Sequence, residues 1–367
     1  MVFCNSITDR VRELRSVEGA HTRTRLSDYE MKESGIGEGA FSMVDLYICA
    51  KGSSSGDNLF AIKSISASEL RSHQIPVYGP TGLEEVFPGK FQLEREIEIL
   101  ENLRRSSSDH VIHIHEILID GDVTHIVYPY RGHPIMSFSS AHIAYSACTD
   151  DRIRGYKSLF IDENEPLHVL AIEEATECLR QLMSAVRVVH AHGICHKDIK
   201  PENVLVLAPF NRWWSRSIPC PPSHLHDAPK SPIHVTLCDF NTAEFTRDGG
   251  KIYDALGTVL FSPPEVFNRP FTDEESTDAS ARDMWSVGLL GYALVCGKLP
   301  ITKLTHLEIQ LELMGMIHNM PEGGHISLPT DWPSVPPGTP LKSVIESLLS
   351  IIPSDRPTAT QALDNLK

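Results

Sequence analysis

The feature that most constrains this chain is a polar stretch, residues 196–203, followed directly by an apolar run, residues 204–207. The stretch reads His-Lys-Asp-Ile-Lys-Pro-Glu-Asn. The carboxylate of Asp198 can accept a proton from a hydroxyl, the ammonium of Lys200 can neutralise a phosphoryl oxygen, and the amide oxygen of Asn203 can bind Mg²⁺. The Val-Leu-Val-Leu run predicts a short buried strand that supports this loop from behind. The two pieces together indicate a compact phosphoryl-transfer site.

The polar stretch resembles the catalytic loop of the protein-kinase family, H-R-D-x-K-x-x-N, with Lys197 where Arg is usual. The resemblance implies an α+β fold in two lobes: a small β-rich lobe with one main helix, and a larger, mostly helical lobe. ATP would lie between the lobes, with Asp198 and Lys200 as catalytic residues. A Lys two residues after the Asp is typical of the serine/threonine class, so the resemblance implies a protein substrate.

Bulk properties restrict the other classes of partner. The chain has 367 residues and a formal net charge of −15, which argues against a general nucleic-acid or membrane-surface binder. No apolar run is long enough to span a bilayer. Eight cysteines without a CxxC pair indicate reduced thiols, so we expect a cytoplasmic or nuclear protein.

A glycine-rich segment near the start predicts a second phosphate contact. Glycines between two strands let backbone N–H groups approach phosphates, although most such turns are plain hairpins. The segment resembles the kinase loop G-x-G-x-x-G, with Ser42 in place of the third glycine. The resemblance implies ATP contacts from the following residues: Ile36, Gly37, Glu38, Gly39 and Val44.

Lys63 lies inside the apolar run 59–65, where an unpaired ammonium would be costly. One alternative is a lysine that extends to solvent from a strand edge. The run resembles the kinase V-A-I-K strand, which implies that Ala61 lines the ATP site and that Lys63 contacts the α- and β-phosphates. Residues 93–103 predict an amphipathic helix, and the resemblance makes its Glu96 the partner of Lys63.

Residues 125–132 predict a strand that runs into the connection between the lobes. By resemblance, Tyr128 would lie at the back of the adenine pocket, while the carbonyl of Pro129 and the N–H of Arg131 would face the base. Residues 167–193 then predict a long helix that leads to the catalytic loop. Two histidines near its end are most simply surface or satisfied polar residues, because their spacing does not require a metal: His190 and His192.

Residues 234–241 resemble the strand that leads to the kinase D-F-G motif. Asp239 would then bind Mg²⁺ together with Asn203. Asn241 replaces the usual Gly, and Asn is among the few residues that tolerate left-handed backbone angles. Cys238 is interpreted as a small core residue, with a reactive thiol facing the nucleotide as the alternative.

Residues 257–265 resemble the kinase segment G-T-x-x-[FY]-x-A-P-E, with Pro in place of Ala. The resemblance implies that Thr258 bonds beside the catalytic loop and favours hydroxyl substrates. It also implies a structural ion pair between Glu265 and Arg356, and a carboxylate, that of Asp283, which caps the catalytic-loop backbone.

Kinases that are switched by phosphorylation usually pair an activation-segment phosphate with the Arg that Lys197 replaces. Asp254 stands four residues before Thr258, where related kinases often carry the phosphorylated Thr. One hypothesis is that Asp254 is a fixed acidic substitute, so that activity needs no such phosphate. The alternative is that Asp254 is simply solvated.

The organisation of the chain follows from these motifs. Residues 1–26 are polar without strong periodicity and predict a flexible tail. Residues 27–367 are interpreted as one kinase domain, with a small lobe at about 27–130 and a large lobe at about 131–367.

Three insertions interrupt this domain, at about 67–90, 137–164 and 208–232. The first is rich in Pro and Gly, which predicts a loop. The third contains Trp213 and Trp214, which we expect to dock on the large lobe rather than on a partner, because paired exposed indoles are costly.

The first insertion and residues 132–136 are similar to segments of the calcium/calmodulin-dependent protein kinase kinases. That resemblance implies an upstream kinase whose substrate is another kinase's activation-loop Thr. The regulatory segment of that family follows the catalytic domain, whereas this chain ends at Lys367, so calmodulin control is not expected.

A pseudokinase scaffold that binds partners through the insertions is the competing class. Its evidence is the set of three departures at Ser42, Lys197 and Asn241. A small-molecule kinase is a further, weaker option, which the complete segment 257–265 disfavours. An active enzyme is favoured because the essential positions are intact: Lys63, Asp198, Asn203 and Asp239.

Overall fold

The computed structural model describes most of the predicted domain, namely residues 25–39, 42–49, 59–72, 74–79, 82–106, 108–139, 144–147, 170, 172–207, 233–246, 249–252, 256–267, 277–301, 305–318, 332, 335 and 338–366. Asp254, the two tryptophans Trp213 and Trp214, and nearly all of the predicted tail lie outside these residues. In the described part of the chain, no helix combines the length and the hydropathy needed to cross a membrane.

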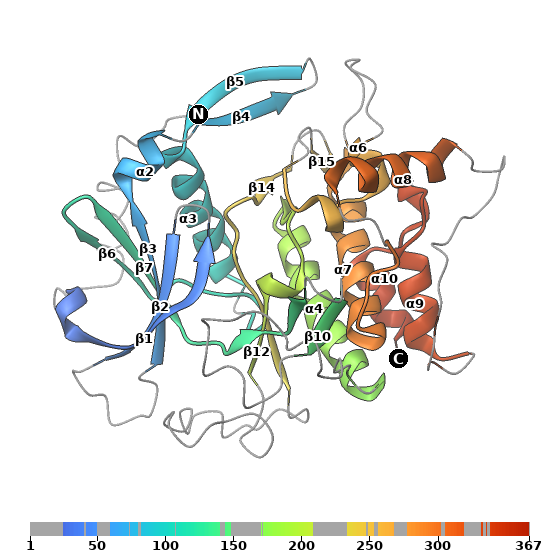
Figure 1. Ribbon diagram of the computed structural model, residues 1–367, viewed down its shortest axis with the longest axis horizontal. Coiled ribbons are helices and arrows are strands. Elements are labelled where there is room, and N and C mark those ends of the chain that lie inside the picture. The colour runs from blue at the N-terminus through green and yellow to red at the C-terminus, as the bar shows by residue number, and fades with distance from the viewer. Residues whose placement is uncertain are drawn as a thin grey trace.

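A five-stranded antiparallel sheet forms the first lobe (Figure 1). Its strands lie in the order β1 (Tyr29–Gly39), β2 (Ser42–Cys49), β3 (Leu59–Ser66), β7 (Val123–Pro129) and β6 (Glu116–Asp120). Successive side chains of a strand point to opposite faces of the sheet. Apolar side chains occur on both faces, because each face packs in an apolar cluster. One face carries its own cluster around Tyr29, Phe60 and Ile62.

Helix α3 (Lys90–Arg104) packs on the other face of this sheet (Figure 1). Leu93, Ile97 and Leu100 are buried at the predicted i, i+4, i+7 spacing, and they share a cluster with Ile126 of β7. The prediction of an amphipathic helix that carries Glu96 is confirmed.

The segment after β3 is not the loop that its Pro and Gly content predicted. It contains α2 (Ala67–Ser72) and an antiparallel hairpin of β4 (Gln74–Gly79) and β5 (Gly82–Pro88). In a two-stranded hairpin both strands are edges, so prolines lose no bond that a central strand would need. Composition alone cannot separate an edge hairpin from a loop.

The second lobe is built around α7 (Ala279–Cys296), whose residues are buried on nearly all sides. Helices α4 (Ile172–Ala191), α9 (Pro340–Leu348) and α10 (Ala359–Asn365) pack together with α7 in one apolar core (Figure 1). Leu170, predicted within the long helix, is instead non-helical, and its N–H bonds to the carbonyl of Leu294. Two further helices complete the described part of this lobe: α6 (Pro264–Phe267) and α8 (His306–His318).

The predicted strand behind the catalytic loop is confirmed as β12 (Val204–Leu207). It pairs with β13 (His234–Leu237) although the insertion 208–232 separates them in sequence, and with β8 (His133–Pro134) on its other side. Figure 1 shows β12 between the sheet of the first lobe and the helices of the second. The two-lobed α+β architecture expected from the resemblance is confirmed.

Short elements complete the described parts. Three small strand pairs are β9 (Met136–Ser139) with β10 (Ala144–Ala147), β11 (Ile194–Cys195) with β14 (Glu244–Phe245), and β15 (Lys251–Ile252) with β16 (Thr277–Asp278). The 3₁₀ turns are η1 (Leu26–Asp28), η2 (Pro201–Asn203), η3 (Val259–Phe261) and η4 (Pro353–Asp355).

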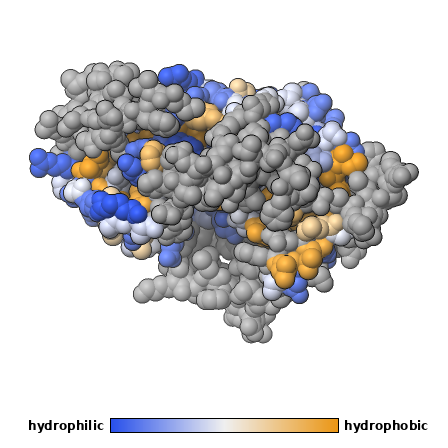
Figure 2. All heavy atoms as spheres, turned by 90° about the horizontal axis from the view of Figure 1, so that it is seen from above, coloured by the Kyte–Doolittle hydropathy of each residue, from blue (hydrophilic) through white to orange (hydrophobic). Residues whose placement is uncertain are grey.

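Hydrophobic residues reach the surface in small, separate patches on the face that Figure 2 shows. The exposed large apolar side chains of α8 are Leu307, Leu311 and Met314. These three residues follow the i, i+4, i+7 spacing, so they lie on one face of α8.

Candidate active site

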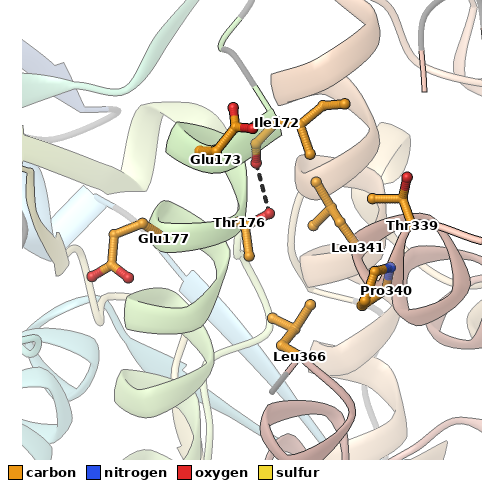
Figure 3. A pocket seen from close by; sticks show the side chains of 8 residues that line it. All are labelled: Ile172, Glu173, Thr176, Glu177, Thr339, Pro340, Leu341 and Leu366. Atoms are coloured by element: carbon orange, nitrogen blue, oxygen red, sulfur yellow. Dashed lines mark hydrogen bonds between the residues drawn. The ribbon is translucent and has the colours of Figure 1, made fainter. Parts of the chain in front are cut away.

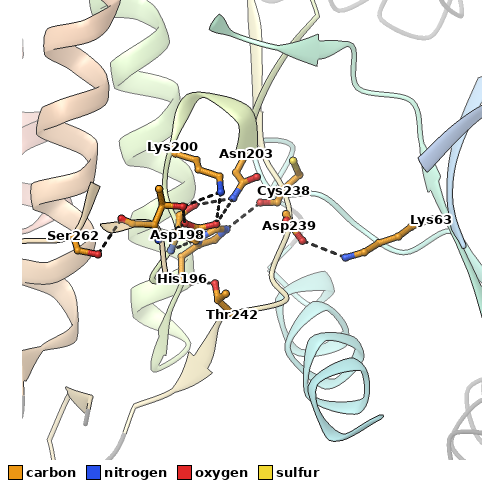
Figure 4. Close-up of polar contacts among 10 residues, drawn as sticks. Lys63, His196, Asp198, Lys200, Asn203, Cys238, Asp239, Thr242 and Ser262 are labelled. Atoms are coloured by element: carbon orange, nitrogen blue, oxygen red, sulfur yellow. Dashed lines mark hydrogen bonds and ion pairs between the residues drawn. The ribbon is translucent and has the colours of Figure 1, made fainter. Parts of the chain in front are cut away.

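Asp198 lies at the centre of the polar contacts of the catalytic loop (Figure 4). The backbone N–H and Oγ1 of Thr258 donate to its Oδ1, at 2.9 and 2.6 Å. The Nζ of Lys200 lies 2.9 Å from its Oδ2, and the Nδ2 of Asn203 donates to the same oxygen at 3.1 Å. Lys200 also donates to Oγ1 of Thr258 at 2.9 Å. The predicted placement of Thr258 beside the loop is therefore observed.

These contacts keep Asp198 ionised. Burial opposes ionisation, but the Lys200 ammonium and the hydrogen bond from Thr258 outweigh it and hold the pKa of the Asp198 carboxyl below its usual value. An ionised carboxylate beside an ammonium can accept the proton of a hydroxyl while the charge of the surroundings stays balanced.

The carboxylate of Asp283 holds the backbone of the catalytic loop. This fully buried carboxylate accepts the backbone N–H groups of His196 and Lys197, both at 2.9 Å, as predicted. His190 contacts the same carboxylate at 2.9 Å, and His192 bonds to a backbone carbonyl at 2.8 Å. Both histidines are therefore satisfied polar residues. Burial disfavours the charge, yet the bond from His190 and its neighbours lower the pKa of Asp283.

Asp239 lies in the segment that follows β13, and this segment runs beside the catalytic loop. The backbone of Asp239 lies in the left-handed region, with φ of +60°, a conformation that is uncommon for a residue with a side chain. The preceding Cys238 accepts a bond from His196 Nε2 at 3.0 Å through its carbonyl, and its N–H donates to the carbonyl of Asn203 at 2.9 Å. The catalytic loop thus holds the segment that presents Asp239.

Asn203 and Asp239 fit a site for a hard cation. The amide nitrogen of Asn203 donates to the carbonyl and carboxylate of Asp198, so its amide oxygen is turned away from that residue. One amide oxygen and one carboxylate are the ligand types that Mg²⁺ prefers when phosphates supply the rest. Within the described residues, no cluster of three His, Cys, Asp or Glu side chains could form an all-protein cage.

Asn241 does not use the left-handed backbone that we expected at this position. Among the described non-glycine residues, positive φ occurs at Lys197 and Asp239, so Asp239 takes the left-handed backbone of the turn. The amide Oδ1 of Asn241 is buried there without a hydrogen-bond partner. Cys238 is half-buried and packs against the main apolar core, and burial raises the pKa of its thiol well above the ordinary value, so the thiolate is disfavoured.

Lys63 and Glu96 form the predicted pair, at 2.8 Å between Nζ and Oε1. Lys63 also lies 3.2 Å from Oδ1 of Asp239. Burial disfavours the ammonium, but Glu96 and Asp239 outweigh it and raise the pKa of Lys63, which therefore stays charged. Its side chain is buried and paired, so the edge-lysine alternative is wrong.

The glycine-rich segment forms the tip of the β1–β2 hairpin. Gly37 pairs with Val44 and Gly39 with Ser42, and residues 40 and 41 lie outside the described residues. Ile36, Gly37 and Val44 are half-buried, whereas Glu38 and Gly39 are exposed.

The predicted adenine-site residues lie where β7 ends. Tyr128 is buried and pairs with Ala61 across the β3–β7 ladder, while Pro129 is the last residue of β7. Burial raises the pKa of Tyr128 well above its usual value, so the phenol is neutral. Pro129 and Arg131 are half-buried at the connection between the lobes.

The activation segment meets the catalytic loop at Gly257. Its φ is +122°, and a Cβ would lie 2.3 Å from the carbonyl oxygen of Lys197, so this position requires glycine. Further along, Arg356 binds Glu265 through two bonds of 2.6 and 2.8 Å, as predicted. The guanidinium is fully buried and lies over the ring of Trp285.

A family model described as the protein kinase domain matches residues 29–366. The chain belongs to the protein kinase family. Membership confirms the predicted kinase fold and enzyme class, and it implies ATP use with a divalent metal.

Relatives among curated proteins agree with this assignment. The kinase is 26% identical over 347 residues to a probable myosin light chain kinase of Dictyostelium discoideum. The aligned region covers 94% of this chain and 68% of that protein. It is 23% identical to the serine/threonine-protein kinase RAD53 of Saccharomyces cerevisiae, with 92% and 33% coverage. It is 24% identical to calcium-dependent protein kinase 4 of Arabidopsis thaliana, with 92% and 52% coverage. The chain thus spans about a third to two thirds of these relatives' lengths.

Two contacts of the kinase were missed by sequence reasoning. Glu244 lies 2.9 Å from the Nζ of Lys197, and Gln92 donates to the backbone carbonyl of Asn241 at 2.9 Å. The sequence-based hypothesis gave Lys197 a different anion, Asp254, and did not consider Glu244. Gln92 carried the weaker signal of a polar residue one turn before Glu96 on the same helix.

A pocket away from the catalytic residues lies between the start of α4 and the helices α9 and α10 (Figure 3). Its floor includes Ile172, Leu341 and Leu366, and two carboxylates, those of Glu173 and Glu177, stand at its side.

Proposed function

We propose that the chain is an active serine/threonine kinase that transfers the γ-phosphoryl group of ATP to hydroxyls of protein side chains. The observation that carries the proposal is the placement of the Asp198 carboxylate, which Lys200, Thr258 and Asn203 contact at 2.6–3.1 Å. The assembled pair of Lys63 and Glu96 supports it, because kinases transfer phosphate only when this pair is in place.

Each of these side chains has a role in the transfer. Asp198 orients the acceptor hydroxyl and takes its proton as the new O–P bond forms. The bond between the γ-phosphorus and the bridging oxygen breaks in line with the attack, and ADP leaves. Lys200 neutralises the transferred group and Lys63 binds the α- and β-phosphates. Mg²⁺, when held by Asp239 and Asn203, supplies positive charge to the phosphates.

An assay with radiolabelled ATP and a protein acceptor tests the proposal. The natural chain should incorporate label, and Asp198→Ala should lower the rate by about 10³-fold. Equal incorporation by both proteins would favour the scaffold alternative. The three departures do not favour that alternative, because Lys197, Asn241 and Ser42 are each accommodated without loss of the contacts above.

A narrower proposal concerns the substrate. We infer an upstream role, phosphorylation of another kinase's activation-loop Thr, from the segment after β3 and residues 132–136. A phosphorylation screen with a peptide library, compared with intact kinases as acceptors, tests it. Calcium-loaded calmodulin added to the same assay checks the expectation that calmodulin is not required.

A reducing compartment, cytoplasm or nucleus, is part of the proposal. Its support is that the cysteines in the described ranges are free thiols: Cys49, Cys178, Cys195, Cys238 and Cys296. Imaging of the tagged chain in cells tests the location.

A further inference from the structure

Lys197 is a buried cation that the transfer mechanism does not use. It lies between His196 and Asp198, its φ is +68°, and its side chain is 0% exposed. Its Nζ lies 2.9 Å from Oε2 of Glu244. A buried ammonium without a counter-charge costs several kcal/mol. Glu244 therefore stabilises the charge of Lys197. Through that charge it also stabilises the left-handed backbone of Lys197, the residue before Asp198.

The carboxylate of Glu244 is held in place by the backbone around it. Glu244 belongs to β14, which pairs with β11, and its Cα partner in that ladder is Cys195. The N–H of Thr246 bonds to the carbonyl of Gly193 at 2.8 Å, which extends the same connection. Because β11 leads directly into the catalytic loop, the ion pair joins two segments whose register is already set.

A second contact joins α3 to the turn after Asp239. Gln92 lies one helical turn before Glu96, so both side chains leave the same face of α3. Its Nε2 donates to the backbone carbonyl of Asn241 at 2.9 Å. The bond fixes the start of α3 against the turn while Glu96 reaches Lys63 at 2.8 Å.

Activation by phosphorylation works by supplying an anion to nearby cations, and in kinases it controls the catalytic loop and the helix that carries the Glu. In this chain the carboxylate of Glu244 already balances the charge of Lys197. The bond from Gln92 to the carbonyl of Asn241 already holds α3. A phosphate brought to Lys197 would also meet the carboxylate of Glu244, which repels it.

We propose that Glu244 and Gln92 are positioning residues that hold the catalytic loop and α3 for phosphoryl transfer without an activation-segment phosphate. The proposal rests on the proposed kinase function and deepens it. Glu244 acts through Lys197, and Gln92 acts through α3 and Glu96. The hypothesis about Asp254 concerns a residue outside the described ranges and stays a separate prediction.

The test uses the full chain, treated with phosphatase and then assayed with radiolabelled ATP. The treated natural chain keeps its kcat. Glu244→Gln lowers kcat by about 10- to 100-fold, because a catalytic group displaced by about 1 Å can lose 10²-fold in rate. The KM for ATP changes little, since Lys63 and the hairpin are untouched. The matched control is Glu177→Gln, which removes an ion-pair carboxylate that faces Arg180 on α4.

A double variant separates positioning from a merely structural role. Lys197→Met together with Glu244→Gln removes the buried charge along with its partner, so Glu244→Gln should lower kcat less in the Lys197→Met background than it does alone. Losses that simply multiply in the double variant would overturn the assignment of Glu244. Loss of activity on phosphatase treatment, restored by an upstream kinase, would overturn phosphate independence. Asp254→Asn, assayed in parallel, shows whether that carboxylate contributes independently.

The α3 contact has its own variant. Gln92→Glu replaces the donor with a carboxylate that faces the Asn241 carbonyl, so the bond is lost. We expect kcat to fall about fivefold, which corresponds to the free energy of about one hydrogen bond. Glu98→Gln, on the exposed side of α3, is the matched control. An unchanged kcat in Gln92→Glu refutes the α3 part of the proposal. An untreated natural chain that transfers no phosphate instead refutes the proposed function, and the positioning roles fall with it.

Discussion

The catalytic loop and the glycine-rich hairpin are both phosphate-facing motifs by resemblance, yet they are held in opposite ways. In the loop, His196, Asp198 and Asn203 are buried. The side chains of His196 and Asp198 make polar contacts with other segments, and the side chain of Asn203 bonds to Asp198 within the loop. In the hairpin, Glu38 and Gly39 are exposed, and the β1–β2 ladder holds the backbone. The loop is therefore preorganised for chemistry, whereas the hairpin stays open to a ligand.

This difference predicts that changes in the loop and its metal segment lower kcat strongly, and changes in the hairpin alter ATP affinity slightly. Asp239→Asn should have the largest effect, because it removes the carboxylate of the proposed metal pair. We expect kcat to fall about 10³-fold and the Mg²⁺ concentration for half-maximal activity to rise. A Mg²⁺ titration of the rate measures both.

The control for this variant is Asp364→Asn, which neutralises an exposed carboxylate on α10. It should behave as the natural chain does. An Asp239→Asn protein with the natural Mg²⁺ dependence would remove Asp239 from the metal site.

Lys63→Met should affect stability as well as rate. It leaves the buried carboxylate of Glu96 without its counter-charge, which destabilises the fold by about 3 kcal/mol. Urea unfolding measures the loss, and Lys63→Met combined with Glu96→Gln should recover most of it. Glu30→Gln, at an exposed pair on β1, should leave the unfolding midpoint unchanged. Equal midpoints for all variants would show that the buried pair contributes nothing net.

The catalytic pieces could be predicted because each residue has a chemistry that its position demands. Lys63 in an apolar strand needed a carboxylate, and Glu96 supplies it. Glu265 and Arg356 likewise meet as the resemblance implied.

Other features depend on tertiary contacts that leave no local pattern. Glu244 is an ordinary acidic residue in a two-residue strand, and its role appears when β14 is paired with β11. The hairpin after β3 has the composition of a loop, because edge strands tolerate Pro. The left-handed residue of the metal turn is Asp239 rather than Asn241, since the neighbouring contacts decide which residue takes that backbone.

Thr258→Val tests the loop by its pH dependence. Burial raises the pKa of Asp198, while Lys200 and the Thr258 hydroxyl lower it further than burial raises it. Because the carboxylate is the active form, activity is lost as the pH falls through this lowered pKa. Removing the hydroxyl raises the pKa, so the acid limb of the kcat/KM profile should move to higher pH. Thr305→Val, at an exposed threonine before α8, should leave the limb in place.

An acid limb at the same pH in Thr258→Val and the natural chain would mean that Thr258 does not set the charge of Asp198. The effect on kcat at neutral pH should be modest, about fivefold, because Lys200 still neutralises the carboxylate.

The smallest effects should come from the hairpin. A Cβ at Gly39 would lie 2.7 Å from Oγ of Ser42, its partner across the ladder. Gly39→Ala should therefore raise the KM for ATP about two- to fivefold, and the modest size follows because a serine hydroxyl can rotate away, at a cost of about 1 kcal/mol. Adding Ser42→Gly to this variant removes the clash, so the double variant should bind ATP more tightly than Gly39→Ala alone. In both proteins kcat should stay near the natural value, since no catalytic-loop contact changes. A large fall in kcat in the double variant would show that the hairpin positions the reacting groups, and the contrast between the two regions would no longer hold.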